Sequence, residues 1–284
     1  MYLSSFRFVT YEQEVSFRWS IQRTCYDTWY PFGILTKHNL RVVDFEPITI
    51  FYGGNGSGKT TALNIIAEKL GVERGTFYNR TNFYEDYLKY CDYECIGEIP
   101  EESRIITSDD VFDFMLNLRC LNQNIDYRRE EMFEEYIEDK SSRFRMRSLD
   151  DYEELRRRNL AKTKTQSQYI RKRLFDNVRE HSNGESAYLY FTDKIKENAL
   201  YLLDEPENSL SPKKQLELKD YLTESARFYN CQFIIATHSP FLLSLYGAKI
   251  YDFDENPVDV KKWTELDTVR DYYEFFKEHE REFE

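Results

Sequence analysis

The segment best suited to chemistry is the glycine-rich run of residues 53–60, Gly-Gly-Asn-Gly-Ser-Gly-Lys-Thr. It matches the pattern G-x-x-x-x-G-K-[S/T], with an apolar run before it and a helical pattern after it. Glycines let successive backbone N–H groups curl around phosphate oxygens, and a helix N-terminus favours negative charge. A turn that matches by chance is the alternative. We predict a phosphate-binding site formed by Gly53, Gly54, Asn55, Gly56, Ser57, Gly58, Lys59, Thr60 and Thr61.

Two neighbouring acids, Asp204 and Glu205, follow the apolar run of residues 199–203. A carboxylate at a strand end can hold Mg²⁺ through water, and the next one can orient an attacking water as general base. We therefore expect Thr60 and Asp204 to bind the metal, Glu205 to act as the base and Lys59 to reach the terminal phosphates. The alternative is that the acids cap a helix.

A single histidine, His238, follows the apolar run of residues 232–236. An isolated histidine is more often a structural residue than a functional one. Its place after the strand next to the acidic one favours a contact with the terminal phosphate instead.

Residues 181–186, His-Ser-Asn-Gly-Glu-Ser, contain the capping-box pattern of Ser182 and Glu185. This pattern predicts a well-capped helix. A capped N-terminus with the small Gly184 could also approach a phosphate of another molecule. Both interpretations can hold together.

The order of these motifs resembles the ABC ATPase superfamily, and especially its SMC-like and bacterial "predicted ATPase" branch. Residues 200–212 and 232–243 carry most of this likeness, which extends over about residues 35–71 and 180–254. The resemblance implies ATP and Mg²⁺ as ligands, ATP hydrolysis, and a head-to-head homodimer. It implies that Ser182, Gly184 and Glu185 act across that dimer, and that residues 208–211 signal between the two sites.

Two departures from the family pattern stand out. Asn183 occupies the position of a second glycine, and no glutamine stands at the family's lid position. Ser108, Asp109 or Asp110 could replace that glutamine, or could simply cap a helix. The aromatic residue that would contact adenine stays open among Trp29, Tyr30 and Phe32.

Charge is unevenly distributed along the chain. The net charge is −12, yet residues 141–173 hold eleven Lys/Arg and four Asp/Glu, a local charge of +7. Such a basic segment could dock nucleic acid or an acidic partner, through arginines at 143, 145, 147, 156–158, 171 and 173 and Lys172. A solvated helical face is the alternative.

The cellular compartment is predicted from the cysteine pattern and from the lack of a membrane span and a secretory signal in the sequence. Five cysteines without disulfide-like spacing fit a reducing environment, and Cys91 and Cys95 alone make a poor zinc site. No apolar run has the length of a membrane span, and the first residues do not resemble a secretory signal. We expect a cytoplasmic protein without a membrane partner.

The order of strands and helices predicts an α/β fold. The resemblance implies an ABC-type P-loop NTPase head with a mostly parallel core sheet, an N-terminal antiparallel β lobe and an inserted helical arm. We expect one head: 1–75 with the β lobe and loop, 76–180 with the lid and arm, 181–260 with the later motifs, and 261–284 as a terminal helix. Strands are predicted at 3–11, 14–19, 41–45, 48–52, 199–203, 232–237 and 249–253. Helices are predicted at 60–70, 108–121, 128–179, 182–191, 212–229 and 267–284, the last burying Val269, Tyr272, Tyr273 and Phe276.

The leading functional hypothesis is an ATPase that closes around ATP and controls a separate effector protein or nucleic acid, in bacterial defence or DNA maintenance. After His238 we expect no room for an appended nuclease domain. The alternatives are the nucleotide-binding subunit of a membrane transporter and an ATP-gated scaffold that holds a toxin inactive.

Overall fold

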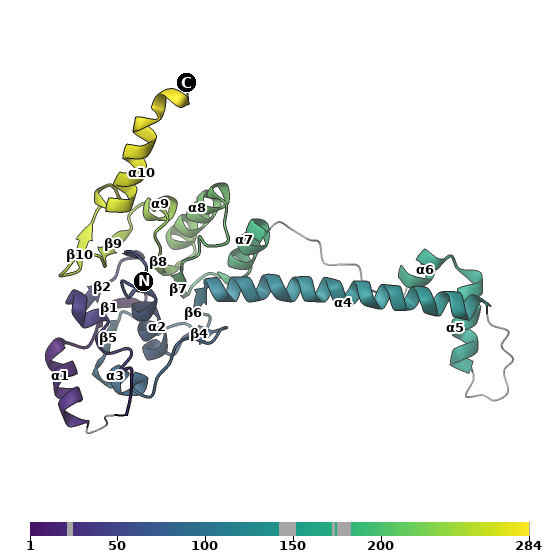
Figure 1. Ribbon diagram of the computed structural model, residues 1–284, viewed down its shortest axis with the longest axis horizontal. Coiled ribbons are helices and arrows are strands. Elements are labelled where there is room, and N and C mark those ends of the chain that lie inside the picture. Colours follow the sequence, from purple (N-terminus) through teal and green to yellow (C-terminus); the bar gives the residue numbers. More distant parts are fainter. Residues whose placement is uncertain (22–24, 142–151, 172–173, 175–182, 284) are drawn as a thin grey trace. The chain divides into compact units, whose positions relative to one another are not determined.

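The computed structural model describes residues 1–21, 25–141, 152–171, 174 and 183–283 (Figure 1). The chain forms two compact units. The first combines Met1–Phe112 with Asn183–Glu284, and the second is Asp113–Ser182. All the described residues of the predicted phosphate, metal and catalytic sites lie in the first unit.

A seven-stranded sheet forms the centre of the first unit. All its strands are parallel to their neighbours except the antiparallel edge pair β10–β9. The three central strands are buried at every residue, as expected for a parallel sheet covered on both faces. The strand order is β10 (Asp259–Lys261), β9 (Lys249–Asp252), β3 (Ile48–Tyr52), β8 (Gln232–Ala236), β7 (Leu200–Asp204), β6 (Arg104–Thr107) and β4 (Glu73–Arg74).

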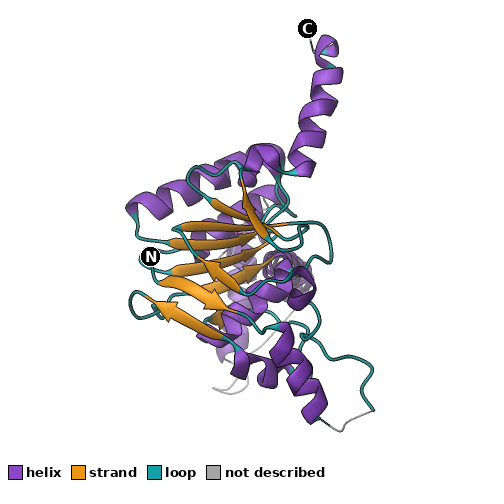
Figure 2. Cartoon of the chain, turned by 90° about the vertical axis from the view of Figure 1, so that its left-hand side faces the viewer, coloured by secondary structure: helices purple, strands orange, loops and turns teal. Residues whose placement is uncertain are grey.

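Helices cover both faces of this sheet (Figure 2). Helix α2 (Lys59–Leu70) packs on β7 and β8, and α8 (Pro212–Phe228) packs on β8 and on two further helices, α7 (Asn183–Lys194) and α9 (Pro240–Leu243). Helix α8 begins where the Ser211 side chain accepts from the Lys214 N–H and Pro212 takes the first helical position. No described helix has an apolar stretch long enough to cross a membrane.

A second, antiparallel sheet stands at the N-terminus, with the order β2 (Val42–Asp44), β1 (Leu3–Arg7) and β5 (Asp92–Cys95). The predicted fold class, with its parallel core, N-terminal antiparallel sheet and long inserted helix, is therefore confirmed.

The strand predicted at residues 14–19 is wrong, because this segment belongs to helix α1 (Tyr11–Ser20). Thr10 and Gln13 form a capping box at its start, and this local bonding outweighs the β-propensity of the aromatic residues that follow. Phe17 stacks on Phe32 at 4.5 Å between ring centroids, which ties the helix to the core. The remaining short elements are α3 (Tyr84–Tyr90), η1 (Leu35–His38), η3 (Trp263–Glu265) and η4 (Glu280–Glu282).

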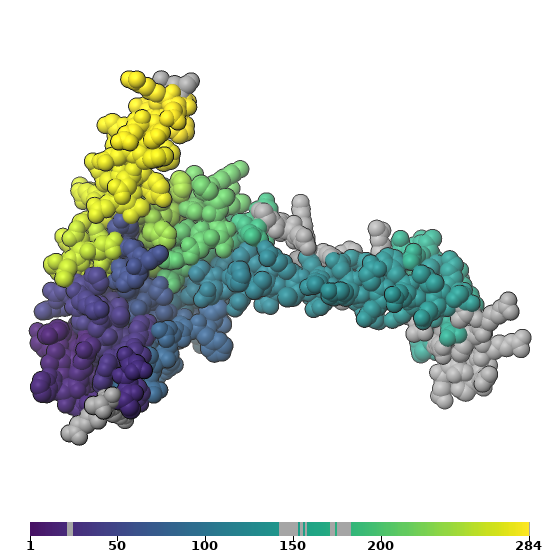
Figure 3. Space-filling view, in the orientation of Figure 1, coloured from purple at the N-terminus to yellow at the C-terminus, as the bar shows by residue number. Residues whose placement is uncertain are grey.

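The C-terminal helix α10 (Asp267–Glu278) has the apolar face that its spacing predicts, but most of this face is not buried. Val269 is buried, whereas Tyr272, Tyr273 and Phe276 are each about half exposed, so their predicted burial is wrong (α10 is yellow in Figure 3). These side chains line a cavity of about 580 Å³ together with Trp263. The periodicity identified an apolar face correctly without determining what covers it.

The second unit has a small core of its own. It lies between the later turns of α4 (Ser108–Ser141), α5 (Tyr152–Thr163) and α6 (Gln166–Arg171). Among the residues that the structure describes between 108 and 179, the two predicted helices are one long helix, α4, followed by the short helices α5 and α6. The core contains the buried side chains of Met132, Tyr136, Ala161, Tyr169 and Ile170.

One residue of the predicted basic docking surface belongs to this interior. Arg158 is only 19% exposed and lies 3.7 Å from the buried carboxylate of Asp139, which also accepts from the Tyr169 hydroxyl. Arg156 is 73% exposed and fits the surface prediction. The docking residues Arg143, Arg145, Arg147, Lys172 and Arg173 lie outside the described residues, as do the side chains of Arg157 and Arg171.

The two sheets of the first unit are joined by a buried glutamine. Gln232 of β8 accepts from the N–H groups of Tyr2 and Leu3 at 2.7 and 2.9 Å, and donates to the Leu3 carbonyl at 2.7 Å. A buried side chain that satisfies several backbone groups is costly to remove.

Replacing Gln232 with Leu should lower the free energy of unfolding by about 3 kcal/mol, because it leaves these buried backbone groups without partners. Urea unfolding followed by circular dichroism measures the change. Gln123→Leu, on the exposed surface of α4, is the control and should shift stability by no more than about 0.5 kcal/mol. Equal effects of the two substitutions would contradict the role given to Gln232.

Candidate active site

The predicted phosphate-binding loop, residues 53–60, connects β3 to α2. Gly58 has φ +97° directly before α2, and a Cβ there would lie 3.1 Å from side-chain carbons of Ile34 and Leu35. Glycine is required at this position for both reasons. The loop therefore ends on the unpaired N–H groups of a helix N-terminus, which favour an anion.

Lys59 folds back over the loop. Its Nζ donates to the carbonyl oxygens of Gly53 and Gly54 at 2.6 and 3.0 Å. The loop and the first turn of α2 border a cavity of about 270 Å³, lined by Ile34, Asn55, Gly56, Gly58, Lys59, Thr60, Thr61 and Glu205. The structure thus brings the loop and the predicted general base to one cavity.

The two predicted metal ligands lie in contact. The Thr60 hydroxyl donates to Asp204 Oδ1 at 3.0 Å. Burial raises the pKa of the Asp204 carboxyl to about 6, the Thr60 hydrogen bond opposes this rise, and the Glu205 carboxylate adds to it. A hydroxyl and a carboxylate are hard oxygen ligands, and Mg²⁺ bound with phosphate needs only one or two protein carboxylates. This pair fits Mg²⁺ by its donor chemistry.

Glu205 is held in an uncommon backbone conformation. Its φ is +47°, in the left-handed region, and its N–H donates to the Ala236 carbonyl of β8 at 2.9 Å. Its Oε2 accepts from Asn208 Nδ2 at 2.9 Å. Strained residues persist where the surroundings fix them, and here the neighbouring strand and Asn208 direct this carboxylate.

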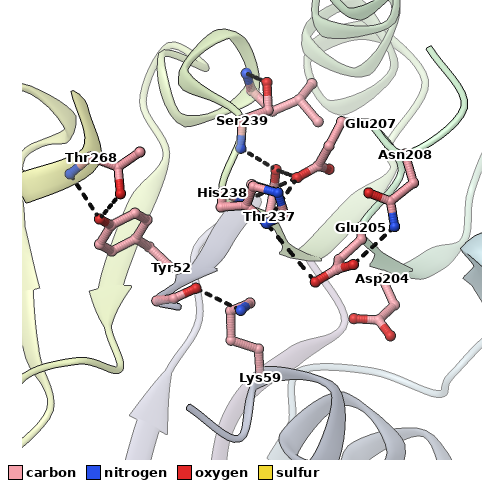
Figure 4. Close-up of polar contacts among 12 residues, drawn as sticks. Tyr52, Lys59, Asp204, Glu205, Glu207, Asn208, Thr237, His238, Ser239 and Thr268 are labelled. Atoms are coloured by element: carbon pink, nitrogen blue, oxygen red, sulfur yellow. Dashed lines mark hydrogen bonds and ion pairs between the residues drawn. The ribbon is translucent and has the colours of Figure 1, made fainter. Parts of the chain in front are cut away.

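His238 follows β8 and faces two carboxylates (Figure 4). Its Nδ1 lies 3.9 Å from Glu205 Oε1 and 3.7 Å from Glu207 Oε1. Its backbone N–H donates to the same Glu207 oxygen at 3.0 Å, and the preceding Thr237 hydroxyl donates there at 2.7 Å. The histidine is thus fixed at the same sheet edge as Asp204 and Glu205.

Of the predicted dimer-facing residues, Ser182 lies outside the described residues, and Gly184 and Glu185 lie in the first turn of α7. A Cβ on Gly184 would lie 3.5 Å from the Ser209 carbonyl and 3.6 Å from the Ser211 nitrogen. The start of α7 therefore packs against the loop that follows Glu205. Neither residue is among those that line the 270 Å³ cavity.

Among the candidates for the lid position, Asp110 is engaged in a cap. Its carboxylate accepts from the Thr107 N–H and hydroxyl at 2.7 and 2.9 Å. Thr107, the last residue of β6, pairs with Asp204 in the sheet register, so Ser108 follows at the same edge of the sheet as Glu205. Asp110 is buried. The capping interpretation holds for Asp110.

The three aromatic candidates have different surroundings. Phe32 is buried in the core, and Trp29 stacks on Phe83 at 4.6 Å between ring centroids. The Tyr30 hydroxyl donates to Thr61 Oγ1 at 3.3 Å. Tyr30 is therefore the one of the three that contacts a residue of the predicted site.

Sequence reasoning missed two carboxylates of this site, those of Asp254 and Glu207. Both oxygens of Asp254 accept from the Gly54 N–H at 2.9 Å, which anchors the start of the loop. Asp254 follows β9, the neighbour of β3, so the rule that sites gather at the carboxyl ends of parallel strands could have identified it. Nothing in the sequence marked Glu207 beyond its closeness to Glu205.

Two family models match the chain. One, described as ABC transporter, matches residues 37–208, which is more than half of the chain. The other, described as AAA ATPase domain, matches residues 183–243. Together they take in the loop, the Asp204–Glu205 pair and His238. No match was found among curated proteins.

Solved structures with similar folds include an Smc head domain from Pyrococcus furiosus bound to the C-terminal domain of ScpA. It is 14% identical over 84% of this chain and 95% of its own, with a TM-score of 0.40. A dimeric bacterial ABC transporter cassette is 14% identical over 79% and 89%, with a TM-score of 0.39. The SMC head domain from Thermotoga maritima is 14% identical over 74% and 88%, with a TM-score of 0.35.

The raised pKa of Asp204 predicts a pH-dependent stability in the absence of nucleotide and metal. Because the folded state binds this proton more tightly than the unfolded state, the stabilisation is complete below about pH 4 and is lost as the pH rises through about 6. Asp204→Asn should therefore raise the free energy of unfolding at pH 7 by about 2–3 kcal/mol and change it little at pH 4. Urea unfolding in EDTA at both pH values measures this, with the exposed Asp220→Asn as control. A gain that is the same at both pH values would refute the assignment.

Proposed function

Because this chain belongs to the ABC family, we propose that it binds Mg-ATP at residues 53–60 and hydrolyses it with Glu205 as general base. The observation that carries the proposal is the shared 270 Å³ cavity. It brings Lys59 and Thr60 of the loop together with Glu205, next to the contact between Thr60 and Asp204.

Binding of the phosphates would fall to the loop. Its backbone N–H groups and the N-terminus of α2 provide donors, and Lys59 Nζ can exchange its carbonyl partners for phosphate oxygens. Thr60 and Asp204 would hold Mg²⁺, which when bound neutralises charge on the phosphates. The ionised form of Asp204 is the one that this role requires.

Hydrolysis would begin with a water placed beside Glu205. The carboxylate orients the water and accepts its proton as the oxygen attacks the γ-phosphorus. The bond from that phosphorus to the bridging oxygen breaks, and ADP leaves with the electron pair. His238 would donate a hydrogen bond to the transferred phosphate, and Asn208 keeps Glu205 directed.

The site is proposed to be completed by a second copy of the chain. Gly184 and Glu185 lie in the first turn of a helix of twelve residues, yet they do not line their own chain's cavity. A helix N-terminus with a small residue suits contact with another copy's phosphate. Ser182, Gly184 and Glu185 would then act in trans, and the Asn208–Ser211 loop against α7 would connect the two sites.

In its wider role the protein is proposed to control a separate effector or nucleic acid through this ATP-dependent closure, in bacterial defence or DNA maintenance. The match of residues 183–243 to an AAA ATPase domain supports an ATPase outside transport. The second candidate is a transporter cassette, which the description of the other matched family favours. Purifying the native complex discriminates them, because an integral membrane partner would support the transporter and overturn the leading role.

Glu205→Gln should block ATP hydrolysis while leaving ATP binding intact. The amide cannot take the proton of water, whereas Thr60 and Asp204 keep their geometry. We expect kcat to fall on the order of a hundredfold or more. Phosphate release and the binding of a fluorescent ATP analogue measure the two properties, with the exposed Glu224→Ala as control. Wild-type turnover in the Gln variant would disprove the assignment of the base.

The Glu205→Gln variant should also form a dimer when Mg-ATP is added, because trapped nucleotide holds the two copies together. Light scattering with and without Mg-ATP measures the mass. Gly184→Arg should abolish the dimer, since a large side chain cannot fit between α7 and a neighbouring phosphate. A mass that stays monomeric with Mg-ATP in the Glu205→Gln variant would count against the sandwich.

A further inference from the structure

Glu207 is a buried acid that the ATPase chemistry outlined above does not use. It is 6% exposed and lies two residues after Glu205, at the start of the loop that leads to α8. Every hydrogen bond that the described residues give its side chain comes from the two residues after β8, Thr237 and His238. These bonds all end on one oxygen, Oε1.

We propose that Glu207 is the positioning residue of His238, an inference that rests on the proposed ATPase function. Its Oε1 accepts from the Thr237 hydroxyl at 2.7 Å and the His238 N–H at 3.0 Å, and lies 3.7 Å from His238 Nδ1. One atom therefore holds the backbone that carries the imidazole and also faces Nδ1 of the ring.

The arrangement also selects a ring nitrogen. A neutral imidazole has one donor and one acceptor nitrogen, and the proton goes to the nitrogen with an acceptor in front of it. Nδ1 faces Glu207 at 3.7 Å and Glu205 at 3.9 Å, both of them acceptors. Glu207 thereby keeps a proton on Nδ1, so His238 can donate from Nε2 to the phosphate only as the imidazolium, which carries a proton on both nitrogens.

Glu205 alone cannot keep the proton on Nδ1 of His238. Its Oε2 is held by Asn208, and in the proposed mechanism its carboxylate must turn to water. Its side chain is also 25% exposed, whereas that of Glu207 is 6% exposed. A buried charge is costly unless it is hydrogen-bonded; Thr237 and His238 bond to Oε1 of Glu207, while its buried Oε2 has no partner among the described residues. In the proposed mechanism, Glu205 therefore orients the attacking water, and Glu207 positions His238.

A double-mutant cycle tests this connection. Glu207→Ala should lower kcat by about tenfold to a hundredfold, as for a lost positioned donor, and change KM for ATP by less than about threefold. In a His238→Ala background the same substitution should change kcat by less than about threefold, because its effect passes through the missing imidazole. Glu224→Ala, an exposed acid on α8, is the control. Independent losses that multiply would overturn the proposal.

A spectroscopic readout does not depend on turnover. In the nucleotide-free protein at about pH 8.5, above the ordinary range of histidine titration, ¹⁵N NMR should show His238 protonated on Nδ1, with assignment by the His238→Ala spectrum. Glu207→Gln keeps an acceptor for Thr237 and removes the charge, so it should fold normally and shift the population towards the Nε2-protonated ring. An unchanged ring in this variant would refute the inference. If the wild type does not hydrolyse ATP, the proposed function fails while this measurement still judges Glu207.

Discussion

The register of three parallel strands is the constraint on which the site depends. Phe51 of β3 and Asp204 of β7 both pair with Ala236 of β8, so the three strands end at one level. Any residue that follows them must therefore meet the others at one edge of the sheet. The phosphate-binding loop, the Asp204–Glu205 pair and His238 come from distant parts of the sequence, and this register alone makes them neighbours.

The same edge collects charge where burial is expensive. Lys59, Asp204 and Glu207 are all buried, and each is held by hydrogen bonds from or to its neighbours. For Asp204 these bonds do not offset the loss of water, as its raised pKa indicates. The apolar strands beneath the edge are buried at every residue. The free energy gained by burying them offsets the cost of burying these charged groups.

The sequence predicted those parts of the site that are written in contiguous motifs. The loop, the acid pair and the central strands each combine a local pattern with a local structure, so periodicity and residue type were sufficient. It missed Asp254, whose bond to Gly54 spans 200 residues, and Glu207, whose bonds span about 30. It also assigned a strand at residues 14–19, where the Thr10–Gln13 capping box decides for a helix. The capping box is a local pattern, whereas the contacts of Asp254 and Glu207 are tertiary and leave no periodic trace in the chain.

The C-terminal helix shows that hydrophobic periodicity can identify an apolar face correctly and still not predict whether it is buried. Its spacing places Val269, Tyr272, Tyr273 and Phe276 on one face, and all four do line one cavity. Burial differs among them because the core beside the helix reaches only Val269. A hydrophobic period reports that a face avoids water, and it is the same whether that face meets its own core or another molecule. Arg158 illustrates the converse, since a run of charges suggested a solvated surface while the ion pair with Asp139 holds one of its members inside.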